Sequence, residues 1–174
     1  MDTDSGSGSL LVEDAVEATE TFERFFEDSH VRLFGAMYLV TGRTTEAEDL
    51  VQESFVKVWE RWDRVRPMVN REGYLFRVAM NAARSRWRRD ALAARVPGRR
   101  AERDAFDEVE QRDTVVRALR EIPPRQRAAV VIVDLLGYDA AQAAEIMAVK
   151  PATVRSLASL ARTALKRALE GGDA

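Results

Sequence analysis

The hydrophobic residues of this chain recur mostly at intervals of three and four, which is the spacing of one face of a helix. Alternation of apolar and polar residues, the pattern of a strand, is scarce. The pattern predicts one or two helices over 15–39 and further helices over 46–62, 72–89, 125–136, 140–147 and from 151 onward. Gly42, Pro67 and the Pro123-Pro124 pair fall between these segments, where helices are expected to end. We therefore expect an all-α protein.

The segment 46–62 has two contrasting faces on a helical wheel. One face is apolar and is expected in the core: Leu50, Val51, Phe55, Val58, Trp59 and Trp62. The opposite face is acidic, with one apolar residue in its middle: Asp49, Gln52, Glu53, Val56 and Glu60. A partner with an arginine-rich helix would fit this face, although an ordinary solvated face has the same composition. Thr44 or Thr45 is expected to cap the helix, since acids follow in its first turn.

The segment 72–89 combines arginines with aromatic residues and follows a loop, 64–71, that contains Pro67. Its apolar residues Tyr74, Leu75, Val78, Ala79, Ala82 and Ala83 suit the core, whereas Arg77, Asn81, Arg84, Trp87 and Arg88 lie around the outside. Cations that follow phosphates and planar groups that stack on bases are what unpaired DNA requires. Tyr74 and Trp87 fit a core position equally well.

Residues 138–167 predict two helices on either side of a sharp turn. Asp139 is a good N-cap for the first helix, residues 148–150 form the break, and Pro151 suits the first turn of the second helix. The second helix has an apolar stripe, Val154, Leu157, Ala158, Ala161, Leu165 and Ala168. Its other side carries Lys150, Thr153, Arg155, Ser156, Ser159, Arg162 and Lys166. This division indicates a helix-turn-helix whose second helix enters a major groove, although a plain helical hairpin would look similar.

Charge is strongly segregated along a chain whose net charge is only −2. Residues 1–60 hold 14 acids and 4 bases, a balance of −10, whereas residues 71–103 hold 10 arginines and 3 acids, a balance of +7. Residues 150–167 add five cations and no acid. A protein with two partners of opposite charge is expected to have such a distribution.

The composition excludes several classes of protein. With 174 residues, no cysteine and one histidine, the chain has no disulfides or thiolate zinc sites and little to bind another metal. We expect no cofactor and no catalytic residues, because phosphate loops and nucleophile motifs are absent. No apolar run is long enough to span a bilayer, and the acidic start is unlike a signal peptide, so we expect a cytoplasmic protein without membrane insertion. The predicted organisation is a disordered tail over 1–18, a helical domain over 19–90, a linker over 91–109 and a helix-turn-helix domain over 110–170.

Four strings, in order, resemble the extracytoplasmic-function (ECF) sigma factors, the small two-domain members of the sigma-70 family. AEDLVQESF at 47–55, with Trp59 after it, resembles the family's region 2. YLFRVAMN at 74–81, closed by WRR at 87–89, resembles its promoter-melting helix. IPPRQR at 122–127 resembles the start of region 4, and 138–167 resembles its helix-turn-helix. The resemblance covers roughly residues 22–169.

The resemblance implies a role for each surface and two small helical domains joined by a flexible linker. The acidic face would bind the clamp helices of the RNA polymerase β′ subunit, and region 4 the β flap. The melted −10 element of promoter DNA would be held by Asn70, Arg71, Arg77, Asn81, Arg84, Trp87 and Arg88. The −35 element would be read by Lys150, Thr153, Arg155, Ser156, Ser159 and Arg162. An anti-sigma factor is a further implied partner, and the free protein would be a monomer.

Some positions depart from the family pattern. The turn commonly has Gly where Ala148 stands, and the recognition helix often has Arg or Gln at the position of Leu157 and Arg at that of Leu160. The loss of cations weakens phosphate attraction, while leucines offer apolar contact to a thymine methyl or to a protein.

Two alternatives stay open, and the departures at Leu157 and Leu160 motivate the first of them. One is a degenerate sigma-like paralogue that binds polymerase or an anti-sigma factor without recognising promoters. The other is a helix-turn-helix repressor, which would be a homodimer on a palindrome and would leave the acidic face and the first arginine-rich zone unexplained.

Overall fold

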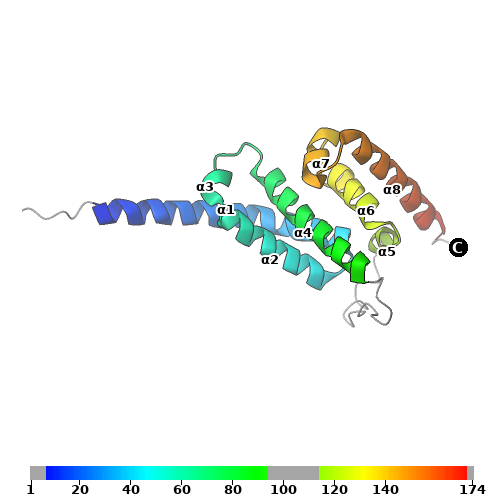
Figure 1. Ribbon diagram of the computed structural model, residues 1–174, viewed down its shortest axis with the longest axis horizontal. Coiled ribbons are helices and arrows are strands. Elements are labelled where there is room, and N and C mark those ends of the chain that lie inside the picture. The colour runs from blue at the N-terminus through cyan, green and yellow to red at the C-terminus, as the bar shows by residue number, and fades with distance from the viewer. Residues whose placement is uncertain (1–6, 94–113, 172–174) are drawn as a thin grey trace, which may run out of the picture.

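The computed structural model describes the backbone of residues 7–93 and 114–171 and the side chains of 22–93 and 114–170. Helices account for its regular structure over this part of the chain, in agreement with the predicted all-α class. The N-terminal unit contains α1 (Ser7–Thr41), α2 (Thr44–Trp59), α3 (Trp62–Val65) and α4 (Arg71–Ala93). The C-terminal unit contains α5 (Thr114–Arg120), α6 (Pro124–Val130), the π-helix η3 (Val131–Leu135), α7 (Ala140–Met147) and α8 (Pro151–Gly171). Figure 1 shows the two units side by side, with α4 between α2 and the C-terminal unit.

The predicted helices are present, with differences at their ends. Helix α1 is one continuous helix that begins at Ser7, whereas a tail was expected over 1–18. Leucines, alanines and glutamates dominate 10–20, and these are good helix formers. Of the expected linker, residues 91–93 are the end of α4, and residues 94–109 lie outside the described residues.

Two local predictions about helix starts had different outcomes. Neither Thr44 nor Thr45 caps α2: the N-cap is Arg43, whose side chain makes no capping hydrogen bond. The Thr41 hydroxyl instead donates to the carbonyl of Arg43 and accepts from its N–H, so a side chain before the helix orders this turn. Asp139 is confirmed as the N-cap of α7: its Oδ1 accepts from the N–H groups of Ala141 and Gln142. The Gln142 side chain accepts in return from the N–H of Asp139, which completes a capping box.

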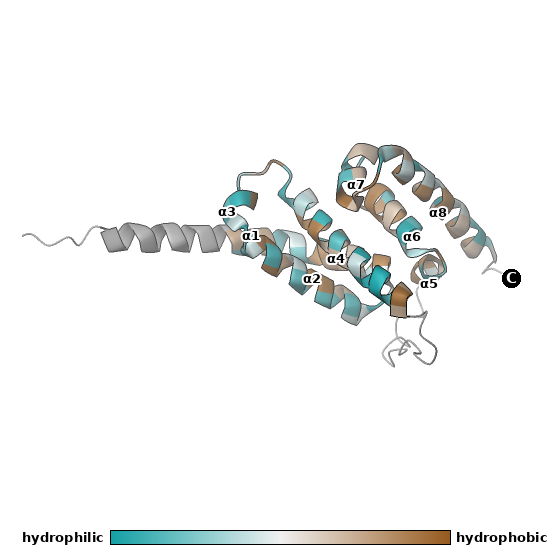
Figure 2. Cartoon of the chain, viewed as in Figure 1, coloured by the Kyte–Doolittle hydropathy of each residue, from teal (hydrophilic) through white to brown (hydrophobic). Residues whose placement is uncertain are grey.

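The core of the N-terminal unit lies between α1, α2 and α4. Leu33, Met37, Leu50, Leu75 and Phe76 are fully buried there, as the helical spacing of apolar residues requires. Teal and brown residues alternate around α2 and α4 in Figure 2, which is the pattern of amphipathic helices. At one end, Phe22 makes edge contacts with Trp59 and Trp62, with ring centroids 4.7 and 5.2 Å apart. This aromatic cluster fixes the end of α2 against α1.

The core of the C-terminal unit is built from α6, α7 and α8. Ile132, Ala143, Val154, Ala158 and Ala161 are buried in it. Small residues on α8 allow this helix to lie close against α6. Buried residues of both units belong to one continuous hydrophobic cluster, so the units are in direct contact.

Candidate nucleic-acid interface

The acidic face of α2, defined by Asp49, Gln52, Glu53, Val56 and Glu60, lies on the surface of the N-terminal unit. Gln52, Asp49 and Glu60 are exposed, and Glu53 is half-buried. The Val56 side chain is 56 % exposed, so an apolar side chain lies among acids on the same face. The structure therefore brings all five predicted residues onto one surface that can bind a partner with both cations and apolar groups.

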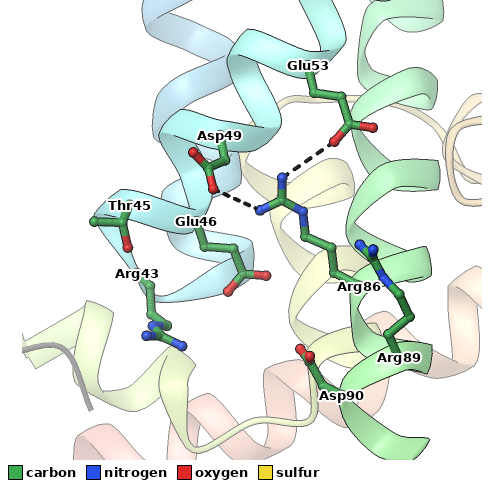
Figure 3. Close-up of a pocket in the computed structure, with 8 residues that line it drawn as sticks. All are labelled: Arg43, Thr45, Glu46, Asp49, Glu53, Arg86, Arg89 and Asp90. Atoms are coloured by element: carbon green, nitrogen blue, oxygen red, sulfur yellow. Dashed lines mark hydrogen bonds and ion pairs between the residues drawn. The ribbon is translucent and has the colours of Figure 1, made fainter. Parts of the chain in front are cut away.

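Arg86 of α4 connects two of these acids, and sequence reasoning did not identify it. Its Nη1 lies 3.3 Å from Oδ2 of Asp49 and its Nη2 lies 3.4 Å from Oε2 of Glu53, as Figure 3 shows. A hydrogen bond from Lys57 lowers the pKa of Glu53, and Arg86 lowers it further. These cations keep the carboxylate ionised on the surface. Arg86 is one of ten arginines in the cationic segment 71–103, and nothing in the sequence indicates that this one contacts α2.

A recess of about 600 Å³ extends from this face toward the end of α4 (Figure 3). Its lining mixes cations and acids: Arg43, Thr45, Glu46, Asp49, Glu53, Arg86, Arg89 and Asp90. Burial raises the pKa of Glu46, although nearby arginines oppose that shift. Because the recess is lined by similar numbers of cationic and acidic side chains, it is not expected to bind a simple anion or a simple cation selectively.

The arginine face, defined by Asn70, Arg71, Arg77, Asn81, Arg84, Trp87 and Arg88, follows the loop before α4 and one side of that helix. Asn70 Oδ1 accepts from the N–H of Gly73 at 2.7 Å and thereby orders the start of α4. The guanidinium carbon of Arg77 lies 5.1 Å from the centre of the Tyr74 ring, a cation–π contact. Stacked groups of this kind can also hold bases.

The predicted residues on the arginine face are not equally accessible. Arg77, Asn81 and Arg88 are exposed, whereas Arg84 and Trp87 are half-buried. Trp87 packs against the hydrophobic core. The sequence allowed either a core or a DNA-binding role for this residue, and the structure shows that it contributes to the core. Arg84 donates from Nη2 to Oδ1 of Asn81 at 2.7 Å, and its Nη1 donates to the carbonyl of Met147 in the C-terminal unit at 2.9 Å.

A cleft of about 300 Å³ separates the arginine face from α7. Its walls come from both units: Met68, Asn70, Gly73, Tyr74 and Arg77 on one side and Gln142, Glu145 and Ile146 on the other. Part of the arginine face therefore faces another segment of the same chain.

The helix-turn-helix has the geometry predicted for 138–167. Helices α7 and α8 are joined through Ala148, whose φ of 50° and ψ of 52° place it in the left-handed region. Glycine adopts this conformation without steric cost, which is why the turn commonly contains it. Helix α8 lies on the far side of α6 from α4 in Figure 1. Its exposed residues include Arg155, Ser156, Ser159 and Leu160, which share one surface.

Not every predicted residue of this helix is free to bind a ligand. Arg162 is held by Asp134 of η3 in two hydrogen bonds, Nε to Oδ2 at 2.8 Å and Nη2 to Oδ1 at 2.7 Å. These bonds raise the pKa of Arg162. Lys150 is exposed, and Thr153 is half-buried at the start of α8. Sequence reasoning missed the Arg162 pair because a π-helix determines where Asp134 points.

Neither a metal centre nor a membrane span emerges from the part of the chain that is described. Within 22–93 and 114–170, where side chains are described, no three acidic or histidine side chains cluster in a way that could hold a metal ion. Over the same residues, none of the helices combines the length and apolarity that crossing a membrane requires.

Comparison with known proteins connects both units to one family. A family model for sigma-70 region 2 matches residues 25–92, and one for sigma-70 region 4 matches residues 112–165. The chain is 32 % identical over 152 residues to the ECF RNA polymerase sigma factor SigM of Mycobacterium tuberculosis, a match that covers 85 % of this chain and 76 % of SigM. It is 32 % identical over 139 residues to the ECF RNA polymerase sigma factor SigE of Mycolicibacterium smegmatis, covering 72 % and 52 % of the two chains.

A solved structure shares the fold. The sigma factor RpoE of Bartonella quintana, in a complex with the anti-sigma factor NepR, matches with a TM-score of 0.69. That match covers 87 % of this chain and 98 % of RpoE at 22 % sequence identity. The arrangement of helices is therefore one that a sigma factor adopts.

Proposed function

Because the chain belongs to the ECF sigma factors of the sigma-70 family, and so acts in transcription initiation with RNA polymerase and promoter DNA, we propose how its surfaces share that work. The N-terminal unit binds polymerase through α2 and holds the melted −10 element through α4. The C-terminal unit reads the −35 element through α8. The observation that carries the proposal is the placement of an acidic face and an arginine face on two neighbouring helices of one small unit.

The acidic face is proposed to bind the clamp helices of the β′ subunit. Asp49, Gln52, Glu53 and Glu60 provide acceptors for cationic side chains, and exposed Val56 provides an apolar contact between them. Apolar contact at the centre with charged groups around it is the usual composition of a stable interface. Arg86 already neutralises part of Asp49 and Glu53, so a polymerase cation has to compete with it. The β flap is the proposed partner of the C-terminal unit.

The arginine face is proposed to hold the unpaired non-template strand of the −10 element. Arg71, Arg77, Arg84 and Arg88 bind phosphates, and Asn70 and Asn81 contact base edges. Trp87 supports the helix from the core side.

Helix α8 is proposed to enter the major groove of the −35 element. Lys150 and Arg155 contact the backbone, and Thr153, Ser156 and Ser159 contact backbone or bases. Arg162 stabilises the packing of α8 on η3 through its two hydrogen bonds to Asp134, and its remaining N–H group is proposed to contact the DNA backbone.

The free protein is proposed to be a cytoplasmic monomer that an anti-sigma factor keeps inactive. RpoE of Bartonella quintana, which shares the fold, binds such a factor. The gene set under its control follows from the promoters that it selects.

The experiment that tests the polymerase surface is a binding titration with core RNA polymerase. The double variant Asp49→Ala/Glu53→Ala is expected to lower affinity at least tenfold, because a hydrogen bond to a charged group contributes about 1.5–3 kcal/mol. A matched control is Glu23→Ala/Glu27→Ala, which removes the same charge from exposed positions on α1. Equal loss in both variants would mean that net charge, and not this face, governs binding.

A further inference from the structure

The acidic face of α2 is partly covered by cations of the same chain. Glu53 meets two of them: its Oε1 lies 2.6 Å from Nζ of Lys57, and its Oε2 lies 3.4 Å from Nη2 of Arg86. Arg86 also reaches Asp49, where Nη1 and Oδ2 are 3.3 Å apart. Two of the acids that are proposed to bind polymerase therefore already have positively charged neighbours in the free protein.

Arg86 lies at the border between two hollows of the surface. One is the recess of about 600 Å³ at the end of α4. The other is a groove of about 470 Å³ along the acidic face, lined by Asp49, Gln52, Glu53, Val56, Lys57, Glu60 and Arg86. A partner cation that enters the groove meets the same carboxylates that Arg86 contacts. Because two guanidinium groups at one pair of carboxylates repel each other, binding of that cation favours the departure of Arg86.

The contacts of Arg86 are long enough to exchange easily. Hydrogen bonds from a guanidinium to a carboxylate normally measure about 2.7–2.9 Å, whereas those of Arg86 measure 3.3 and 3.4 Å and go to two different residues. Arg162 provides a contrast within this chain, since it holds Asp134 through bonds of 2.8 and 2.7 Å. The Asp49 side chain is 66 % exposed, and ion pairs that water can reach contribute little to stability. Arg86 can therefore leave the acidic face with little loss of stability.

The recess offers Arg86 a second place to bind. Asp90 lies four residues after Arg86 on α4, and side chains at this spacing are neighbours on a helix surface. Glu46 of α2 lines the same recess, as Figure 3 shows. Burial raises the pKa of Glu46, and the charges of Arg43 and Arg86 oppose that shift, so Arg86 is within electrostatic reach of this carboxyl. A guanidinium released from the acidic face thus has two further acceptors nearby.

From this geometry we propose that Arg86 competes with RNA polymerase for Asp49 and Glu53, and that polymerase binding moves it into the recess. The inference rests on the proposed role of the acidic face. Arg86 is thus a residue that sets the affinity for core polymerase by covering the acids that polymerase uses. In the free protein only the fraction with Arg86 in the recess presents both acids, and the apparent affinity is reduced by that fraction.

The effect of Arg86 on polymerase binding can be separated from binding of DNA. With 3.6 residues per turn, Arg77, Arg84 and Arg88 of the arginine face each lie about half a turn around α4 from Arg86. The Arg86 side chain is only 22 % exposed and turns toward α2. A substitution of Arg86 therefore leaves the arginine face unchanged, and affinity for core polymerase without DNA is the quantity to measure.

The test compares the full-length protein with Arg86→Gln in a binding titration with core RNA polymerase. The variant is expected to bind about three- to fivefold more tightly at low salt, because an exposed ion pair no longer has to be broken. The gain is expected to shrink at high salt, since salt screens charges that water can reach. Arg86→Lys keeps the charge and is expected to stay close to wild type.

Arg89→Gln is the matched control for net charge. Arg89 is exposed on the same helix and lines the same recess. Among the side chains drawn in Figure 3, no hydrogen bond or ion pair joins Arg89 to Asp49 or Glu53. Its substitution is expected to give less than half of the gain of Arg86→Gln. An equal gain would mean that total charge sets the affinity, and would overturn the inference.

A double-mutant comparison tests whether Arg86 acts through the two acids. In the Asp49→Ala/Glu53→Ala background no acid remains to be uncovered, so adding Arg86→Gln is expected to leave affinity for polymerase unchanged. Removing both acceptors in the recess with Glu46→Gln/Asp90→Asn is expected to weaken binding of polymerase about twofold, because Arg86 then stays on the acidic face. The same pair of substitutions is expected to have no effect when Arg86 is already Gln.

The outcomes separate this inference from the proposed function. Weaker or unchanged polymerase binding by Arg86→Gln, with an unchanged melting temperature, would show that Arg86 supports the acidic face and would overturn the inference alone. Should Arg86→Gln fail to fold, unchanged or tighter binding by Glu46→Gln/Asp90→Asn would overturn it instead. Wild-type affinity in Asp49→Ala/Glu53→Ala would remove the proposed role of the acidic face as well.

Discussion

At the scale of single residues, the structure separates two leucines that the sequence could not. Leu157 packs against the core of the C-terminal unit. Leu160 is 55 % exposed on the surface of α8 that also presents Ser156 and Ser159. Only Leu160 is therefore placed to contact DNA, and an apolar side chain in a major groove recognises the methyl group of thymine.

Leu160 is expected to make transcription sensitive to one thymine methyl in the −35 element. Replacing each thymine there by uracil, which lacks the methyl, should reduce output about fourfold at a single position, since burying one such group contributes about 0.8 kcal/mol. Leu160→Ala should respond equally to thymine and uracil at that position. Leu169→Ala, an exposed leucine at the far end of α8, is the control. A uracil effect that persists in Leu160→Ala would show that another residue reads the methyl.

Glu46 provides a prediction about pH. Burial raises its pKa in the folded protein, so the folded state favours the protonated form. A raised folded pKa means that stability is fully present below the unfolded value of 4.5 and is lost as pH rises through the folded pKa. Glu46→Gln mimics the protonated form, so it should raise the melting temperature at pH 7 and have little effect well below pH 4.5. Exposed Glu48→Gln should show no such difference, and a lower melting temperature for Glu46→Gln at pH 7 would mean that attraction to nearby arginines outweighs burial.

At the scale of elements, helix positions could largely be predicted, because apolar spacing determines which face is buried. The N-caps of the helices show the limit of such prediction. Asp139 was predictable since its partner Gln142 lies three residues away in sequence, whereas the start of α2 depends on Thr41 in the preceding helix. The π-helix could not be predicted, because its five-residue hydrogen bond from Leu136 to Val131 depends on the packing of both neighbours.

The turn of the helix-turn-helix contains the clearest local strain. Ala148 has a φ of 50°, where a side chain costs roughly 1–2 kcal/mol relative to the right-handed region. Ala148→Gly is therefore expected to stabilise the protein by about 0.5–1 kcal/mol, after the greater freedom of glycine in the unfolded chain is subtracted. Denaturant unfolding measures this change. Ala152→Gly, in the first turn of α8, should act in the opposite direction; destabilisation by Ala148→Gly would contradict the account.

At the scale of the whole molecule, the sequence indicated the surfaces but not how the units meet. Charge segregation identified an acidic and a cationic zone, and these became the acidic face of α2 and the arginine face of α4. The contact between units depends on backbone carbonyls of Leu136 and Met147, and a carbonyl has no sequence signal. The close approach of Gly42 to Arg120 likewise has no sequence signal. A β-carbon added to Gly42 would lie 2.9 Å from the Cγ of Arg120.

The surfaces of the whole molecule also favour a sigma factor over the two alternatives. A repressor needs no acidic face, and a paralogue that does not recognise promoters needs no accessible arginines on α4. Arg77, Asn81 and Arg88 are exposed, and the chain belongs to the ECF family over both units. Promoter-specific initiation is thus the activity that all of these surfaces together support.

The most direct measurement is run-off transcription on a promoter library with core RNA polymerase of Mycobacterium tuberculosis, the source of the SigM relative. Wild type is expected to select a set of promoters that share −10 and −35 sequences. Asn81→Ala should relax or abolish the sequence preference at the −10 element. Arg155→Ala should reduce the amount of transcript from promoters that depend on the −35 element. Neither variant should lose polymerase binding. Polymerase binding without initiation from any promoter would contradict the account and favour the degenerate paralogue.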